Sequence, residues 1–218
     1  MIKKFIDLML CLVFPNQLKR KWENYQDPNL DLKDFSIDEL SKFLFKTINV
    51  PPANSITELG CHDGKRLAAL REYLGNLEID FKGVDINSSV IEFGKLKYAN
   101  LKNFELSVAD LFDYVDQERF DLVFTYATLM YVHPLKLKPL IRSLIHKSRT
   151  LILIEPVSNR LLSTILPRRN LSYTHNYESK IKSIIKDENF QYRVIKMPKG
   201  IWSPKYGEPC AFVITNNN

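Results

Sequence analysis

The sequence predicts an α/β fold built around a mostly parallel sheet. From residue 54 onward, strand-like and helix-like runs alternate along the chain, which is typical of parallel strands joined by helices. Residues 150–155 form an apolar run, as expected of a strand buried on both faces. The last two strand-like runs have no helical segment between them, so we expect them to pair antiparallel.

Residues 1–53 are predicted to form a helical extension or lid. Ser36 can cap a helix, and Glu39 stands at the capping-box position. Apolar residues then recur at helical spacing from Ile37 to Leu44, and the prolines from Pro51 end the helix.

Residues 54–218 are predicted to form the main domain, with a seven-stranded sheet. Strands are expected over residues 55–59, 79–85, 104–109, 120–126, 150–155, 191–197 and 211–215. Helices are expected over residues 64–74, 88–99 and 177–188, with another after Pro134. Residues 157–178 show no clean period and contain several arginines, so we expect a substrate lid there.

Composition and charge suit one globular domain with appendages. The chain has 218 residues, of which 45% are hydrophobic and 26% charged. Its net charge is +6, and Asp121–Lys182 holds ten Lys and Arg against three Asp and Glu. This excess is either a solvated surface or a means of attracting an anionic substrate or membrane. The three cysteines match neither a disulfide framework nor a zinc site, so we expect a reducing, cytoplasmic setting.

The first 21 residues leave two alternatives open. Their apolar run is interrupted by Asp7, lacks a cleavage site and is too short to span a bilayer. As a helix it has one apolar face, followed by basic Lys19–Lys21. It either packs on the domain or its ligand site, or makes peripheral contact with a membrane.

The stretch from Ser55 to Leu70 predicts a nucleotide-binding turn. A strand carries Glu58 near its end and breaks at Gly60, and a helix follows Gly64. Backbone at such a turn can approach a ligand closely. The glycine spacing does not fit a dinucleotide fingerprint, and Gly64-Lys65-Arg66 does not fit a P-loop.

Three acidic residues fall at the carboxyl ends of the first three predicted strands. They are Glu58, Asp85 and Asp110. Ligands of open α/β sheets bind along this edge. Asp85 could take two ribose hydroxyls, and Asp110 could meet an adenine edge.

These motifs resemble those of the class I S-adenosylmethionine-dependent methyltransferases. Glu58–Gly64 is similar to their first motif, Val84–Asn87 to their ribose-binding loop, Ala109–Leu111 to their adenine-contact motif and Phe120–Phe124 to their fourth strand. His62 departs from the pattern, because it replaces the middle glycine. The resemblance implies a Rossmann-like three-layer sandwich that binds S-adenosylmethionine. The cofactor-binding residues it implies are Glu58, Gly60, Cys61, His62, Gly64, Asp85, Ile86, Asp110, Leu111 and Tyr126.

The acceptor side is expected after the fourth strand and near the lid. In the resembling family a histidine after this strand often lies close to the substrate, so His133 is a candidate base or acceptor ligand. Its alternative role is to stabilise the turn before the next helix. Tyr131 and His175, with Tyr177, are further candidates whose alternative roles are packing and loop structure. Glu155 is either structural or catalytic.

Several methyltransferase classes do not fit. The chain lacks the Asn/Asp-Pro-Pro-Tyr and Pro-Cys signatures of DNA-base enzymes, the two-glutamate loop of arginine enzymes and a catechol-type metal site. We therefore expect no DNA substrate and no metal, and methyl transfer to an oxygen or carbon of a small acceptor.

Arg160, Arg168 and Arg169 suggest an anionic acceptor, such as a sugar nucleotide or a lipid-linked intermediate. An RNA-modifying enzyme is an alternative, although the sequence shows no RNA-binding appendage. A non-catalytic scaffold that binds S-adenosylmethionine is another.

Overall fold

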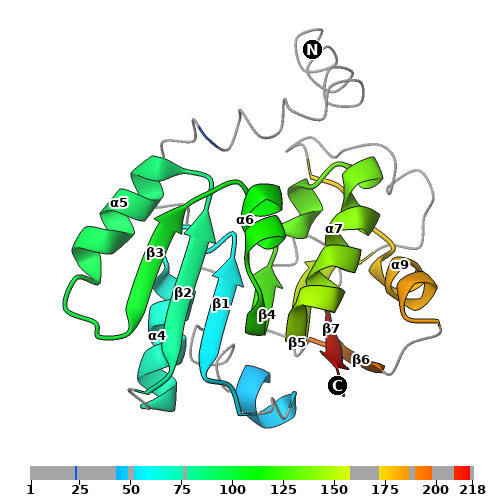
Figure 1. Cartoon of the computed structure of the whole chain (residues 1–218), viewed down its shortest axis with the longest axis horizontal. Coiled ribbons are helices and arrows are strands. Elements are labelled where there is room, and N and C mark those ends of the chain that lie inside the picture. The colour runs from blue at the N-terminus through cyan, green and yellow to red at the C-terminus, as the bar shows by residue number, and fades with distance from the viewer. Residues whose placement is uncertain are drawn as a thin grey trace, which may run out of the picture.

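The computed structural model describes residues 23, 43–48, 52–75, 78–157, 172–186, 190–197 and 209–216. Its centre is a seven-stranded sheet in the order β3-β2-β1-β4-β5-β7-β6 (Figure 1). The strands are β1 (Ser55–Leu59), β2 (Asp80–Asp85), β3 (Phe104–Val108), β4 (Phe120–Tyr126), β5 (Ser148–Pro156), β6 (Phe190–Lys196) and β7 (Pro209–Asn216). β1 to β5 pair in parallel, and β7 pairs antiparallel with both β5 and β6. The Rossmann-like fold class is therefore confirmed.

Helices and short helical turns join these strands. They are η1 (Phe43–Thr47), α4 (Lys65–Leu74), α5 (Ser88–Lys97), α6 (Leu111–Gln117), η2 (Leu129–Tyr131), α7 (Pro134–Lys147) and α9 (Tyr177–Ile184). The sequence pattern did not predict α6. Its seven residues are too few for a clear helical period, and Asp110 caps its start by accepting a hydrogen bond from the Phe112 N–H at 2.8 Å.

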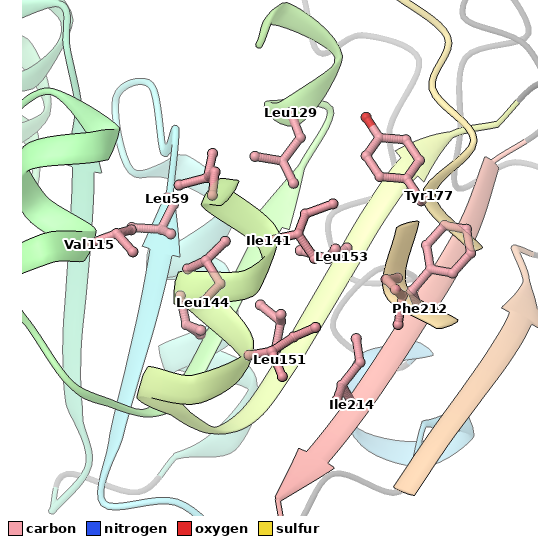
Figure 2. Packing of buried hydrophobic residues seen from close by; sticks show 14 of the residues in the cluster. Leu59, Val115, Leu129, Ile141, Leu144, Leu151, Leu153, Tyr177, Phe212 and Ile214 are labelled. Carbon is pink, nitrogen blue, oxygen red and sulfur yellow. The ribbon is translucent and has the colours of Figure 1, made fainter. Parts of the chain in front are cut away.

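Apolar side chains alternate between the two faces of the central strands. In β4, Val123 packs toward α6, α7 and α9, whereas Leu122 and Phe124 pack toward α4 and η1. Figure 2 shows the first of these layers, in which Ile141 and Leu144 of α7 lie over the sheet. With both faces covered, the ligand edge is left at the carboxyl ends of the parallel strands.

Much of the predicted N-terminal extension lies outside the described residues. Within it, Phe43, Leu44 and Ile48 are buried and join the core on the α4 face. Residues 158–171 of the predicted lid and residues 198–208 between β6 and β7 also lie outside the described part. In the described part of the chain, no helix is both long and apolar enough to cross a bilayer.

Candidate active site

The turn after β1 contains left-handed backbone conformations, which glycine adopts more easily than other residues. Gly60, His62 and Gly64 have φ values of 73°, 56° and 77°. The Gly60 N–H donates to the Val84 carbonyl at 2.7 Å, which ties the turn to β2. A Cβ built on Gly60 would lie 2.3 Å from the Thr128 side chain, so no larger residue fits there. The turn is therefore pressed closely against both neighbouring strands.

Asp85 ends β2 beside this turn, and backbone groups hold its carboxylate. The His62 N–H donates to Oδ2 at 2.9 Å, and the Asn87 N–H donates to Oδ1 at 3.0 Å. The left-handed conformation of His62 brings its N–H to Asp85. Each carboxylate oxygen has a further lone pair, which suits two neighbouring hydroxyl donors such as those of a ribose.

Glu58 forms a buried ion pair that the sequence pattern did not predict. Its Oε1 accepts a hydrogen bond from the Arg66 Nε at 2.7 Å, and the Arg66 guanidinium lies 4.9 Å from the centre of the Tyr126 ring. Burial raises the pKa of Glu58 to about 7, although Arg66 opposes the shift. The other oxygen, Oε2, is buried and has no hydrogen-bond partner among the described residues. An acceptor for an ammonium or hydroxyl group is thus available beside the turn.

The His62 side chain is held within the turn. Its Nδ1 lies 3.6 Å from the Asp63 Oδ1, and the Lys97 Nζ lies 3.3 Å from the Asp63 Oδ2. Burial alone would raise the pKa of Asp63, but hydrogen bonds from His62 and the Lys65 N–H, with the charge of Lys97, lower it. His62 therefore adopts a defined place in the turn, where the resembling family has a glycine.

The predicted adenine side lies beside Asp85. β2 and β3 pair with Asp85 opposite Val108, so Ile86 and Asp110 follow adjacent strand ends. Ile86, Asp110 and Leu111 are half-buried. Because Asp110 caps α6, its backbone position is fixed as well.

Two other predicted cofactor residues turn their side chains into the core. Cys61 is buried against Ile91 and Leu106, so its backbone is the part that belongs to the turn. Tyr126 is buried beneath Arg66.

His133 caps α7 at the predicted acceptor side. Its Nδ1 accepts a hydrogen bond from the Leu135 N–H at 3.3 Å, and its side chain is 7% exposed. In a neutral ring with Nδ1 as acceptor, Nε2 carries the proton and acts as a donor. This arrangement suits an acceptor ligand better than a general base. Tyr131, half-buried, lies two residues earlier on η2.

His175 lies in the core. Its ring is fully buried, stacks on Tyr173 at 5.5 Å and has Nε2 3.0 Å from the Val132 carbonyl. Burial lowers the pKa of His175 to about 3, so the ring is neutral near pH 7. Tyr177 is also fully buried and packs on Phe212, with 5.7 Å between ring centres (Figure 2). His175 and Tyr177 therefore support the acceptor side from within the core.

Among the described residues, no group of three or more His, Cys, Asp or Glu could hold a metal ion.

Comparison with known proteins gives one family match. Residues 56–147 match the family model described as a methyltransferase domain. This span runs from β1 to the end of α7, so it includes the glycine turn, Asp85, Asp110 and His133. No curated protein sequence matches the chain significantly.

Similar solved structures cover nearly the whole chain. The N-methyltransferase NodS from Bradyrhizobium japonicum WM9, in complex with S-adenosylhomocysteine, is 13% identical, with a TM-score of 0.67 and coverage of 94% of this chain and 98% of that one. The plantazolicin methyltransferase BpumL is 15% identical, with a TM-score of 0.65 and coverage of 99% and 100%. Magnesium protoporphyrin IX methyltransferase from Synechocystis PCC 6803 is 18% identical, with a TM-score of 0.59 and coverage of 98% and 97%. At these identities the likeness concerns the fold.

Proposed function

We propose that this chain is a class I S-adenosylmethionine-dependent methyltransferase and that it methylates an oxygen or carbon of a small anionic acceptor. The main observation that supports binding of S-adenosylmethionine is the position of the Asp85 carboxylate, which two backbone N–H groups hold at the end of β2. S-adenosylmethionine, when bound, supplies an electrophilic methyl group on a sulfonium.

The residues present fit that cofactor. The free lone pairs of Asp85 suit the ribose hydroxyls, while Ile86, Asp110 and Leu111 are suited to contact the adenine. The buried Oε2 of Glu58, beside the turn, suits the amino group at the methionine end. Methyl transfer is an in-line displacement, so the main task of these residues is to align the cofactor with the acceptor.

Two features support an anionic acceptor. α7 contains four Lys and Arg residues and no Asp or Glu, and its Lys136 and Lys138 are exposed close to the acceptor side. His133, as an Nε2–H donor, suits an oxygen atom of the acceptor. The three arginines of the predicted lid lie outside the described residues and remain part of the proposal.

Calorimetry with S-adenosylhomocysteine tests the cofactor side. Replacing Asp85 by Ala removes two charge-assisted contacts and is expected to weaken binding by about 100-fold or more. The matched control is Asp80→Ala, an exposed position at the amino end of the same strand, which should leave the affinity unchanged. Absence of binding to the unaltered protein would contradict the proposed function.

A screen with a labelled methyl donor tests the acceptor side. It should include sugar nucleotides, lipid-linked sugar phosphates, their neutral analogues and bulk RNA. Incorporation into a small anionic compound, and less into its neutral analogue, is the expected result. Labelling of RNA alone would favour an RNA-modifying enzyme. Binding of S-adenosylhomocysteine without any labelling would favour a non-catalytic scaffold.

A further inference from the structure

The connection between β4 and α7 carries both candidate acceptor-side residues, Tyr131 and His133. It spans residues 127–133 and begins with Ala127, whose φ of 53° is unfavourable for a residue with a side chain. Its only helical part is the three-residue turn η2. A turn this short leaves its first N–H groups without partners inside the turn. The connection therefore needs outside contacts to keep one conformation.

Glu155, at the end of β5, supplies contacts on one side of the connection. Its Oε1 accepts hydrogen bonds from the N–H groups of Thr128 at 3.0 Å and Leu129 at 2.9 Å, and its Oε2 accepts from the Met130 N–H at 3.2 Å. The Thr125 hydroxyl donates to Oε1 as well, at 2.9 Å. The carboxylate is fully buried, so water does not compete for these donors. One side chain thus satisfies three consecutive backbone N–H groups.

Residues 172–176 hold the opposite, carbonyl side of the connection. The Tyr173 N–H donates to the Met130 carbonyl at 2.7 Å. The His175 Nε2 lies 3.0 Å from the Val132 carbonyl, and because a carbonyl oxygen can only accept, Nε2–H donates this bond. His133 and Tyr173 also pack edge to face, with 5.9 Å between ring centres. The connection is therefore bound on its N–H side by β5 and on its carbonyl side by the segment before α9.

We propose that Glu155 and His175 are positioning residues that together fix the β4–α7 connection, and so set where Tyr131 and His133 meet the acceptor. This inference rests on the proposed function for the role of the acceptor side. It gives His175 a task other than direct catalysis, since its ring has no exposed surface. Residues 172–176 also belong to the C-terminal part of the predicted lid, residues 157–178, so the same contacts join that part of it to the acceptor side.

The chemistry of the two side chains provides conservative variants. Glu155→Gln keeps the volume and one acceptor oxygen, but the amide nitrogen would face the Met130 N–H, so a donor would meet a donor. His175→Gln keeps an N–H donor for the Val132 carbonyl, whereas His175→Leu removes it. The matched control is Thr150→Val, because the Thr150 hydroxyl is buried on the same strand without a partner among the described residues.

Backbone hydrogen exchange measured by NMR tests the contacts without an acceptor. Glu155→Gln should speed exchange at Met130 by about tenfold, the effect of losing one hydrogen bond, and His175→Leu should speed exchange at residues 128–130 because the connection loses its contact at the Val132 carbonyl. His175→Gln should restore protection, and Thr150→Val should change nothing. Exchange at His62, whose N–H is bound by Asp85, should stay constant, as should the affinity for S-adenosylhomocysteine.

Transfer kinetics with the acceptor found in the screen form the second readout. Glu155→Gln and His175→Leu should lower kcat/KM for the acceptor by about tenfold and leave KM for S-adenosylmethionine unchanged. Unchanged exchange at residues 128–130 would overturn the inference. Equal losses of protection at His62 and of cofactor affinity would also overturn it, because they would show a general loss of stability. Failure of the unaltered protein to bind S-adenosylhomocysteine would refute the proposed function, while the exchange data would still decide whether the contacts exist.

Discussion

Burial of His175 predicts a specific dependence of stability on pH. Burial, with repulsion from Lys180, lowers the pKa of this ring from 6.5 to about 3 in the folded protein. A group whose folded pKa is depressed contributes its full stability above its unfolded pKa and loses it as pH falls toward the folded value. Between pH 7 and pH 5 the unfolded chain binds a proton that the folded ring does not. The loss from His175 over this interval is about 2 kcal/mol.

Two buried carboxyls act in the opposite direction. Burial raises the pKa of Glu58 and of Glu155 to about 7, so each loses stability as pH rises toward and through 7 and regains it on acidification. Glu155 is subject to opposing effects, since its hydrogen-bond donors favour the ionised form. The overall stability of the protein therefore cannot isolate His175, and a comparison with a variant is needed.

The measurement compares the unaltered protein with His175→Gln by urea unfolding, followed by circular dichroism, at pH 7 and pH 5. The variant lacks the titrating ring, so the difference between the two free energies of unfolding should move by about 2 kcal/mol in its favour at pH 5. Thr150→Val should differ from the unaltered protein by the same amount at both pH values. A constant difference for His175→Gln would refute the reasoning, because the ring would then titrate as in water.

Other predictions concern the cofactor side. Arg66→Met leaves the buried Glu58 without its partner and should lower the free energy of unfolding by about 3 kcal/mol. Adding Glu58→Gln should recover much of this loss, and urea unfolding measures both variants. Gly60→Ala should destabilise the protein and weaken binding of S-adenosylhomocysteine by about tenfold or more, because its Cβ would meet Thr128. Gly75→Ala is the matched control, since Gly75 has a positive φ but nothing within 4 Å, and should show a backbone cost of only about 1 kcal/mol and normal binding.

Local patterns were enough to predict the strands but not the contacts between distant segments. β1 and β4 begin and end at the predicted residues, because each is a short strand-like run with a clear boundary. The prediction of His175 as a catalytic candidate rested on its neighbours in the sequence. Its burial depends instead on the packing of residues 172–176 against Val132, about 40 residues earlier.

The cofactor side was easier to predict than the acceptor side for the same reason. Gly60 and Asp85 lie at adjacent strand ends, so chain order places them together. Arg66 reaches Glu58 across the turn, and only the spacing of eight residues between opposite charges pointed to that pair. The hydrogen bonds that Glu155 accepts from the N–H groups of residues 128–130 join the end of β5 to the connection after β4. They depend on the orientation of the Glu155 side chain, which the sequence pattern does not predict.

The position of β7 has a consequence for biosynthesis. This strand lies between β5 and β6, yet it follows β5 by more than 50 residues and is made later than either neighbour. Until it emerges from the ribosome, the edge of β5 has no partner on that side, and β6 cannot join the sheet. By contrast, the pairings among β1, β2, β3 and β4 need no strand made after β4. The other edge of β4 pairs with β5, the next strand to be made. During translation, the half of the sheet that holds Asp85 can therefore assemble first, and the half that holds Glu155 is completed last.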